Sequence, residues 1–270
     1  MERPAWAPQG IDISVPSVAR IYDYYLGGSH NFEADREAAR KAMEFMPGLP
    51  KIMQAHRAFM RRAVHYAAGQ GITQFLDVGS GIPAFGNVHE VAREADPAAR
   101  VVYVDHDPVA VAHSRAVLEG DALSAVAAAD LRKPRDILHS QEVTSLLDLG
   151  RPVALLLVCV LHFIEDADDP YRAVAELRDA LAPGSLLIAS HASYEGMPVP
   201  EQQANGAIEV YRDIRNPIVM RTRAQVEAFF EGYETVDPGL VSPPLWRPSG
   251  PTDQEDPYAF SGFAGVGRKA

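Results

Sequence analysis

Cysteine is nearly absent from this sequence: Cys159 is the only one in 270 residues. One thiol cannot form an internal disulfide, which excludes a disulfide-stapled scaffold and favours a reducing compartment. Long apolar runs are also missing, since the longest, residues 153–161, has the length of a buried strand and not of a membrane span. The first ten residues lack the apolar core of a signal peptide. We therefore expect a cytoplasmic protein without a membrane-spanning segment.

Positive charge is scarce as well. The chain has 25 lysines and arginines against 36 acidic residues, a formal net charge of −11, and no run rich in Lys or Arg. Binding to nucleic acid or to an anionic membrane surface depends on clustered positive charge. We therefore expect neither as a partner. The length suits one large α/β domain or a domain with an appendage.

The first 70 residues predict three helices and no strand. Apolar residues recur at helical spacing over residues 18–26, and further helices are expected at 33–45 and about 50–68. Asn31 is the expected cap of the second helix. Four polar or aromatic residues lie near turns or away from the apolar stripes: Tyr24, Asn31, His56 and Arg57. We expect them to belong to a lid that contacts the substrate; a helical cap that only covers the sheet edge is the alternative.

From residue 74 onward, strand patterns alternate with helix patterns. Strands are expected at 74–77, 100–104, 125–129, 153–160 and 185–190, and two more at 233–236 and 260–266. Such alternation is typical of a mostly parallel sheet covered by helices. The sequence therefore predicts an α/β fold in which residues 1–70 form a helical cap and residues 71–270 form the sheet domain.

The stretch at residues 74–83, Q-F-L-D-V-G-S-G-I-P, organises this second part. A short apolar strand runs into a glycine-rich turn and then toward a helix N-terminus, where backbone N–H groups bind anionic or polar ligands. Gly79-x-Gly81-x-x-Ala84 fits the loose dinucleotide fingerprint, which alone is a weak signal. Asp77 sharpens the interpretation, because a carboxylate there would repel a pyrophosphate but attract an ammonium group or hydroxyls. S-adenosylmethionine carries both of these groups.

Three carboxylates follow or end predicted strands: Asp77, Asp105 and Asp130. In an open α/β sheet the ligand lies at the carboxyl ends of the strands, beside the glycine loop. A carboxylate at Asp105 can accept hydrogen bonds from both ribose hydroxyls, and Asp130 is placed to accept one from an adenine amino group. Together with the glycine loop, the three acids predict an adenosine pocket.

With these residues named, the sequence resembles a known family. The runs L-D-V-G-S-G, V-Y-V-D-H-D-P, A-A-D-L-R and L-L-L-V-C-V-L-H-F look like the motif series of class I S-adenosylmethionine-dependent methyltransferases. The N-terminal segments Y-D-Y-Y-L-G-G, N-F and D-R at residues 22–36 resemble a narrower group, the S-adenosyl methyltransferase family. The chain departs from that pattern at His56, where we expect relatives to carry Asn.

The resemblance implies a Rossmann-like class I methyltransferase fold: a seven-stranded, mostly parallel sheet with an antiparallel last strand, helices on both faces and an N-terminal helical appendage. It implies S-adenosylmethionine as the cofactor and S-adenosylhomocysteine as its product, but it does not imply a substrate; we expect a small-molecule acceptor. The expected cofactor-binding residues are Asp77, Gly79, Ser80, Gly81, Ile82, Asp105, His106, Ala129, Asp130, Leu131, Val160 and Leu161.

His162 follows the fourth predicted strand and is the candidate catalytic residue. In several O-methyltransferases that this segment resembles, a histidine here deprotonates the acceptor hydroxyl, and an imidazole suits that task at neutral pH. The alternative is a positional role, in which His162 caps the turn or hydrogen-bonds the amino-acid end of the donor.

His162 with Glu165 and Asp166 could be taken for metal ligands, but a solvated cluster before a helix is favoured, and we expect no metal. Cys159 is expected to be a small core residue and not a nucleophile.

Two other functions are consistent with parts of this pattern. A binding protein could hold S-adenosylmethionine or S-adenosylhomocysteine without transferring the methyl group. A NAD-dependent oxidoreductase has a related fold, but Asp77, the two late strands and the lack of a Tyr-x-x-x-Lys proton donor argue against it. We expect methyl transfer, with O-, N- and C-acceptors and the oligomeric state left open.

Overall fold

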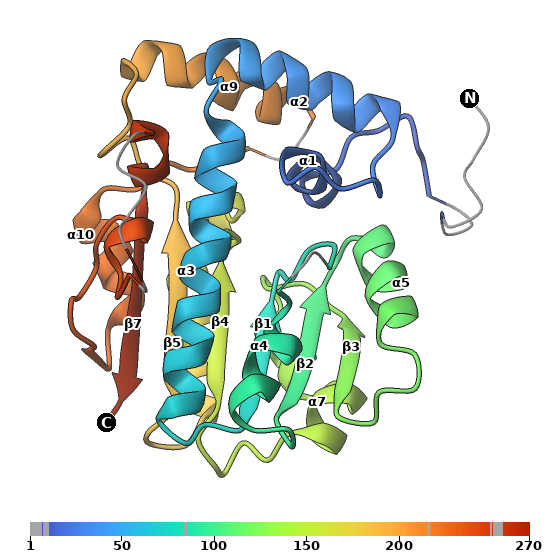
Figure 1. The fold of residues 1–270 in the computed structure, drawn as a ribbon, viewed down its shortest axis with the longest axis vertical. Helices are drawn as coiled ribbons and strands as arrows, with labels where there is room; N and C mark the ends of the chain where they lie inside the picture. The colour runs from blue at the N-terminus through green and yellow to red at the C-terminus, as the bar shows by residue number, and fades with distance from the viewer. Residues whose placement is uncertain (1–6, 8–10, 84–85, 215–216, 249, 251–255) are drawn as a thin grey trace.

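The computed structural model describes residues 7, 11–83, 86–214, 217–248, 250 and 256–270. Its strands are β1 (Gln74–Val78), β2 (Arg100–Asp105), β3 (Ser124–Ala128), β4 (Ala154–Val158), β5 (Leu186–His191), β6 (Tyr233–Thr235) and β7 (Phe263–Lys269). They form one seven-stranded sheet in the order β3-β2-β1-β4-β5-β7-β6 (Figure 1). β1 to β5 are parallel, and β7 runs antiparallel between β5 and β6. The predicted sheet, with its antiparallel last strand, is confirmed.

Helices cover both faces of this sheet. They are α3 (Leu49–Gly69), α4 (Val88–Ala95) and α5 (Pro108–Val117) on one side, and α6 (Pro134–Leu138), α7 (Gln141–Leu146), α8 (Pro170–Ala180) and α10 (Arg223–Glu227) on the other. The sequence pattern predicted no element for α6 and α7, which occupy the connection from β3 to β4. None of the described helices combines the length and apolar character needed to cross a membrane.

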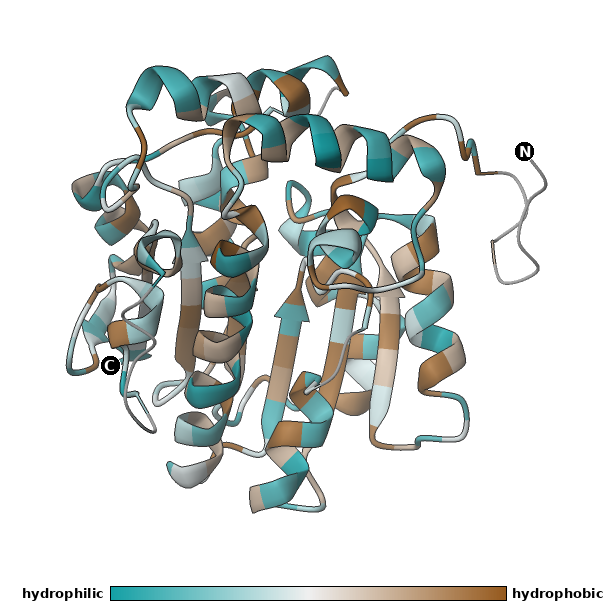
Figure 2. Cartoon of the chain, turned by 45° about the horizontal axis from the view of Figure 1, so that its top comes forward, coloured by the Kyte–Doolittle hydropathy of each residue, from teal (hydrophilic) through white to brown (hydrophobic). Residues whose placement is uncertain are grey.

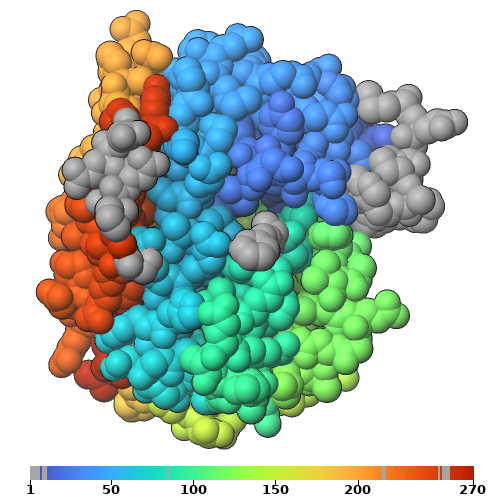
Figure 3. Space-filling model, viewed as in Figure 1, coloured from blue at the N-terminus to red at the C-terminus, as the bar shows by residue number. Residues whose placement is uncertain are grey.

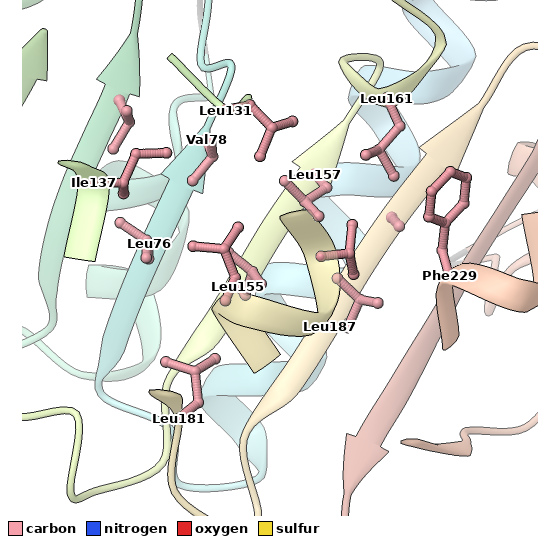
Figure 4. Packing of buried hydrophobic residues seen from close by; sticks show 14 of the residues in the cluster. Leu76, Val78, Leu131, Ile137, Leu155, Leu157, Leu161, Leu181, Leu187 and Phe229 are labelled. Atoms are coloured by element: carbon pink, nitrogen blue, oxygen red, sulfur yellow. The ribbon is translucent and has the colours of Figure 1, made fainter. Parts of the chain in front are cut away.

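Alternate residues of the central strands fill two apolar layers, as a parallel sheet buried on both faces requires. Leu76, Leu155 and Leu187 lie in the layer that contains Leu181 and Phe229 (Figure 4). Phe75 and Leu156, Ile188 on the neighbouring strand, and Phe59 of α3 lie in the opposite layer. The strands are thereby fixed against both helical layers, and their carboxyl ends are held in register.

A third helical layer lies across the carboxyl ends of the parallel strands (Figure 1). It consists of α1 (Val18–Tyr25), α2 (Glu33–Phe45), α9 (Glu201–Asp213) and the first half of α3, packed through one apolar cluster. The outward faces of its upper helices are largely hydrophilic (Figure 2). The layer extends beyond the predicted range 1–70, because α9 belongs to it. Residues 1–70 also do not all lie in this layer, because the second half of α3 packs on the sheet.

A buried charge cluster fastens this helical layer to the sheet. The Asp35 carboxylate, fully buried, accepts hydrogen bonds from Arg20 Nε at 2.9 Å, from the Ser17 backbone at 2.9 Å and from the Phe32 backbone at 2.7 Å. Ser17 Oγ donates to Asp107, whose carboxylate also caps α5 by accepting from two backbone N–H groups. Arg20, Asp35 and Asp107 thus join α1, α2 and the start of α5, whose segments lie against each other in Figure 3.

The predicted cap of α2 is wrong. The residue before the helix is Phe32, and its backbone N–H is satisfied by Asp35. The Asn31 amide instead donates to Asp23 at 2.8 Å and to the Gly28 carbonyl at 3.0 Å. Asn31 therefore fixes the turn between α1 and α2, and the observed cap lies one residue later than the pattern indicated.

The charge cluster predicts that a change at Asp35 lowers the stability of the protein. Asp35→Asn keeps the side-chain shape but leaves the buried Arg20 guanidinium with only the more distant Asp107 carboxylate, at 3.9 Å, as counter-charge, which costs about 3–5 kcal/mol in the free energy of unfolding. Glu37→Gln, an exposed change of the same charge on α2, is the matched control and should change stability by less than about 0.5 kcal/mol. Urea unfolding of the two variants measures the difference. Equal unfolding midpoints would show that the cluster contributes nothing to stability.

Candidate active site

A cavity of about 370 Å³ lies at the carboxyl ends of β1, β2 and β4, beneath α1. The sheet order reverses between β1 and β4, which is where open α/β sheets bind ligands. Ten of the twelve expected cofactor-binding residues line the cavity: Asp77, Gly79, Ser80, Gly81, Asp105, His106, Ala129, Asp130, Leu131 and Val160. Helices α1 and α3 close it from above with side chains that include Ser17, Tyr22 and Arg57.

The glycine loop forms the part of the cavity wall that follows β1. Gly79 and Gly81 have φ angles of +74° and +67°, a region that residues with side chains rarely adopt. A Cβ atom on Gly79 would also lie 2.3 Å from Val160 Cγ2, so only glycine fits between the loop and the end of β4. Ser80 Oγ is buried and has no hydrogen-bond partner among the described residues. Ala84, the last residue of the predicted fingerprint, lies outside those residues.

Asp77 lies in β1, paired with Tyr103 and Leu156 on the neighbouring strands, and only 8% of it is exposed. Burial raises the pKa of its carboxyl to about 7, with the Arg57 charge opposing and the Asp105 charge adding to that shift. Ionising a carboxyl group buried in this way is unfavourable, and a cationic group beside it would stabilise the ionised form. The part of the cavity beside Asp77 therefore suits an ammonium group.

Asp105 ends β2 and is held in place by two backbone donors. One carboxylate oxygen accepts from Asp107 N at 2.8 Å, and the other accepts from Gly81 N at 2.7 Å. Burial raises the pKa of this carboxyl, and the two backbone hydrogen bonds oppose the shift. Each oxygen keeps a free lone pair, so the group can accept from a vicinal diol while it also fixes the glycine loop.

Asp130 lies beyond β3 and is paired with a residue that the sequence prediction did not include. Its carboxylate accepts from the Arg132 backbone and guanidinium, with Arg132 Nη2 at 2.6 Å. Although burial acts to raise it, the hydrogen bonds and charge of Arg132 hold the pKa of Asp130 below its ordinary value. An adenine amino group would share this carboxylate with Arg132, which also lines the cavity.

Four predicted site residues lie elsewhere. Ile82 packs in a small apolar cluster with Phe32, and Leu161 belongs to the main core of the sheet. Tyr24 and Asn31 line neither this cavity nor the smaller one beside it, and Asn31 is engaged in the turn described above. A role for these four in ligand contact stays a prediction.

A second cavity, of about 80 Å³, adjoins the first and contains two of the predicted residues, His56 and His162. The two cavities share Val18, Tyr22, Cys159 and Phe163. Burial lowers the pKa of His56 to about 4, opposed by a hydrogen bond with the Ser261 backbone. Burial, with smaller effects from nearby His191, His56 and Arg221, holds the pKa of His162 well below its ordinary value. Both imidazoles are neutral at physiological pH.

This arrangement has close counterparts among known proteins. The model of a family described as S-adenosyl methyltransferase matches residues 4–270. The chain belongs to the S-adenosyl methyltransferase family. With that membership, it is an S-adenosylmethionine-dependent methyltransferase, and S-adenosylmethionine is its cofactor.

Solved structures agree with this family. A DUF574 family protein from Streptomyces avermitilis MA-4680 is 38% identical, with a TM-score of 0.91 over 96% of this chain and 99% of that one. A candidate methyltransferase from Thermobifida fusca YX is 41% identical, with a TM-score of 0.91 over 98% and 99%. A Burkholderia thailandensis 1,6-didemethyltoxoflavin N1-methyltransferase, 16% identical with a TM-score of 0.51 over 87% and 89%, shares the fold alone. Among curated proteins no match was found.

Besides Arg132, the prediction gave no site role to two residues at or beside the cavities, Cys159 and Arg221. Cys159 was expected inside a strand, but β4 ends at Val158 and Cys159 adopts a φ of +56°, with its backbone N–H donating to Ser190 Oγ at 3.1 Å. It therefore lies in the wall that both cavities share, where burial raises the pKa of its thiol to about 12. A thiol with that pKa is neutral at physiological pH, which disfavours nucleophilic attack.

Arg221 is the second, and it fixes the segment that carries His162. Only 1% of Arg221 is exposed, and its guanidinium donates to the Leu161 carbonyl at 3.1 Å and to the Ile164 carbonyl at 3.0 Å. It also pairs with Asp166 at 2.5 Å, so this carboxylate is engaged with a cation of the chain. Nothing in the sequence near residue 162 indicates this partner.

The raised pKa of Asp77 predicts a pH-dependent stability in the donor-free protein. The folded carboxyl binds its proton up to pH about 7 and the unfolded one only up to about 4. Stability is therefore lost as the pH rises through this window. Asp77→Asn has no such group, so its stability relative to the wild type should increase from pH 4 to pH 8, by roughly 2–4 kcal/mol.

Urea unfolding at pH 4.5, 6 and 8 measures this change, with the exposed Glu231→Gln as the charge-matched control. Asp77→Asn should also lose affinity for S-adenosylhomocysteine, since the Asp77 carboxylate is then missing. Parallel pH profiles for Asp77→Asn and the wild type would contradict a buried, protonated Asp77.

Proposed function

We propose that the larger cavity holds S-adenosylmethionine and that the methyl group passes to a small-molecule acceptor beneath the helical layer. The observation that carries this proposal is the buried Asp77 carboxyl beside the glycine loop, close enough to Arg57 for that cation to oppose its raised pKa. A carboxylate and a guanidinium facing one cavity suit the ammonium and carboxylate groups of an amino acid. When bound, the donor supplies an electrophilic methyl group on a sulfonium.

Unpartnered polar atoms in the cavity support this fit. Arg57 Nη2 and Ser80 Oγ are buried and have no hydrogen-bond partner among the described residues. Leaving such groups unsatisfied costs about 1–3 kcal/mol each, more for a charged group, and a ligand that bonds them removes that cost. We assign Arg57 to the donor's carboxylate, Asp77 to its ammonium, and Ser80 to either polar end of the same moiety.

The remaining predicted residues are assigned to the adenosine half. Asp105 would accept from the ribose hydroxyls, because its orientation is already fixed by Gly81 N and Asp107 N. His106, Ala129 and Leu131 would lie against the adenine, with Asp130 accepting from its amino group. A hydrogen bond to a charged acceptor contributes about 1.5–3 kcal/mol, and Asp105 has two oxygens that could accept from the two ribose hydroxyls.

Enclosure supports a small acceptor and argues for catalysis over mere binding. The helical layer covers the strand ends, and the smaller cavity adjoins the larger one through four shared residues. A protein that only held the donor would have no use for a second cavity beside it. We propose that α1, α2 and α9 act as the lid of the site, which excludes water during transfer.

Donor binding gives the direct test of this function. S-adenosylhomocysteine at one hundred times its dissociation constant adds about 2.7 kcal/mol to stability, a melting shift of roughly 5–10 °C for a chain of this size. NAD should give no shift. Asp105→Asn should weaken S-adenosylhomocysteine binding roughly ten- to hundredfold, whereas Asp213→Asn, an exposed change of the same charge, should leave it unchanged. A shift with NAD alone would overturn the proposal.

His162 carries the finer prediction about mechanism. It lines the smaller cavity and not the larger one, so His162→Ala should leave S-adenosylhomocysteine affinity within about twofold. If the neutral imidazole accepts the acceptor's proton, turnover should fall roughly 10²–10⁴-fold. Formation of S-adenosylhomocysteine across a panel of metabolites would identify an acceptor for this assay. Weaker donor binding with unchanged turnover at saturation would instead show a positional role.

A further inference from the structure

The smaller cavity differs in chemistry from the donor cavity beside it. Its described lining contains no Asp, Glu, Lys or Arg, whereas the donor cavity is lined by six acidic residues and two arginines. Aromatic and aliphatic side chains dominate, and four methionines contribute: Met46, Met53, Met197 and Met220. A charged group moved into such surroundings loses its hydration without gaining a counter-charge. The lining therefore selects against ionic occupants.

Three polar side-chain atoms of residues in this wall have no partner among the described residues. His56 Nδ1, His162 Nδ1 and Ser261 Oγ are buried and have no hydrogen-bond partner within the described part of the chain. The three residues come from α3, from the turn after β4 and from the segment before β7, and they all line the same cavity. Because buried polar atoms are usually satisfied, these three indicate a missing hydrogen-bonding ligand. The imidazoles are uncharged, so a neutral hydroxyl is a suitable partner.

The cavity is also small. Its volume is about 80 Å³, and one water-sized atom needs roughly 10–15 Å³ by this measure, which leaves room for about five to eight non-hydrogen atoms. A six-membered ring with one substituent has this size. Val18, Tyr22, Cys159 and Phe163 line both this space and the donor cavity, so an occupant here lies next to the donor.

We propose that this cavity is the acceptor site and that the part of the acceptor that enters it is a neutral, mainly apolar group of about five to eight non-hydrogen atoms bearing one hydroxyl. This inference rests on the proposed methyl transfer and adds the acceptor's class. The methionines provide deformable walls for a ring, and His56, His162 and Ser261 recognise the hydroxyl. Acidic and basic metabolites of the same size are excluded by the cost of removing their charge from water.

Phenol, toluene and benzoate are the probes for this site. Their binding can be followed by ligand-observed NMR on the full-length protein saturated with S-adenosylhomocysteine, whose own binding is measured by calorimetry. Phenol should bind at least about tenfold more tightly than toluene, and benzoate should not bind. Ala207→Leu, which fills the cavity from α9, should abolish phenol binding without changing S-adenosylhomocysteine affinity, because Ala207 does not line the donor cavity. Ala116→Leu, exposed on α5, is the matched control.

His56→Phe keeps a ring of similar shape and removes the hydrogen bond. It should lower phenol affinity by about tenfold and leave toluene affinity unchanged, which keeps the inference testable if Ala207→Leu fails to fold. Equal binding of phenol and benzoate, or phenol binding that survives Ala207→Leu, would overturn the inference. If the wild type did not bind S-adenosylhomocysteine, the proposed function itself would be refuted, so the two failures are distinguishable.

Discussion

The buried pairing of Arg20 with Asp35 and Asp107 holds this structure together at the point where its two layers meet. Burying three charges costs several kcal/mol per ion, and backbone hydrogen bonds to both carboxylates offset that cost. The cluster places α1 across the strand ends, so that Val18 and Tyr22 of α1 form walls of both cavities. The cluster therefore helps to hold α1 over the cavity that contains the glycine loop and the acids beside it.

Enclosure explains why the two cavities differ in their electrostatics. Removal from water raises the pKa of Asp77 and lowers the pKa of His56 and His162, so each group is pushed toward its neutral form. Arg57 lies near Asp77, and a cationic ligand group would stabilise the Asp77 carboxylate further. The two histidines line a mainly apolar cavity and stay neutral. The fold thus separates a polar donor site from a neutral acceptor site within one covered space.

Local sequence patterns predicted the sheet well and placed the expected acids at its carboxyl edge, because strand ends and glycine turns depend on neighbouring residues. Asp77, Asp105 and Asp130 all line the cavity, since parallel strands bring their carboxyl ends to one edge. The acceptor side was harder, because it depends on contacts between distant segments. Arg221 fixes the loop of His162 from 59 positions away in chain order, and the backbone turn at Cys159 has no sequence signal. Asn31 was assigned to a helix cap because the pattern cannot show that Asp23 binds its amide.

The central claim is that donor and acceptor occupy adjoining cavities under the helical layer. A crystal structure of the protein with S-adenosylhomocysteine tests it most directly. The account predicts that the amino-acid moiety contacts Asp77 and Arg57, and that the sulfur faces the wall formed by Tyr22 and Cys159, toward the smaller cavity. A sulfur that points away from that wall, or a ligand bound outside the glycine loop, would contradict the account.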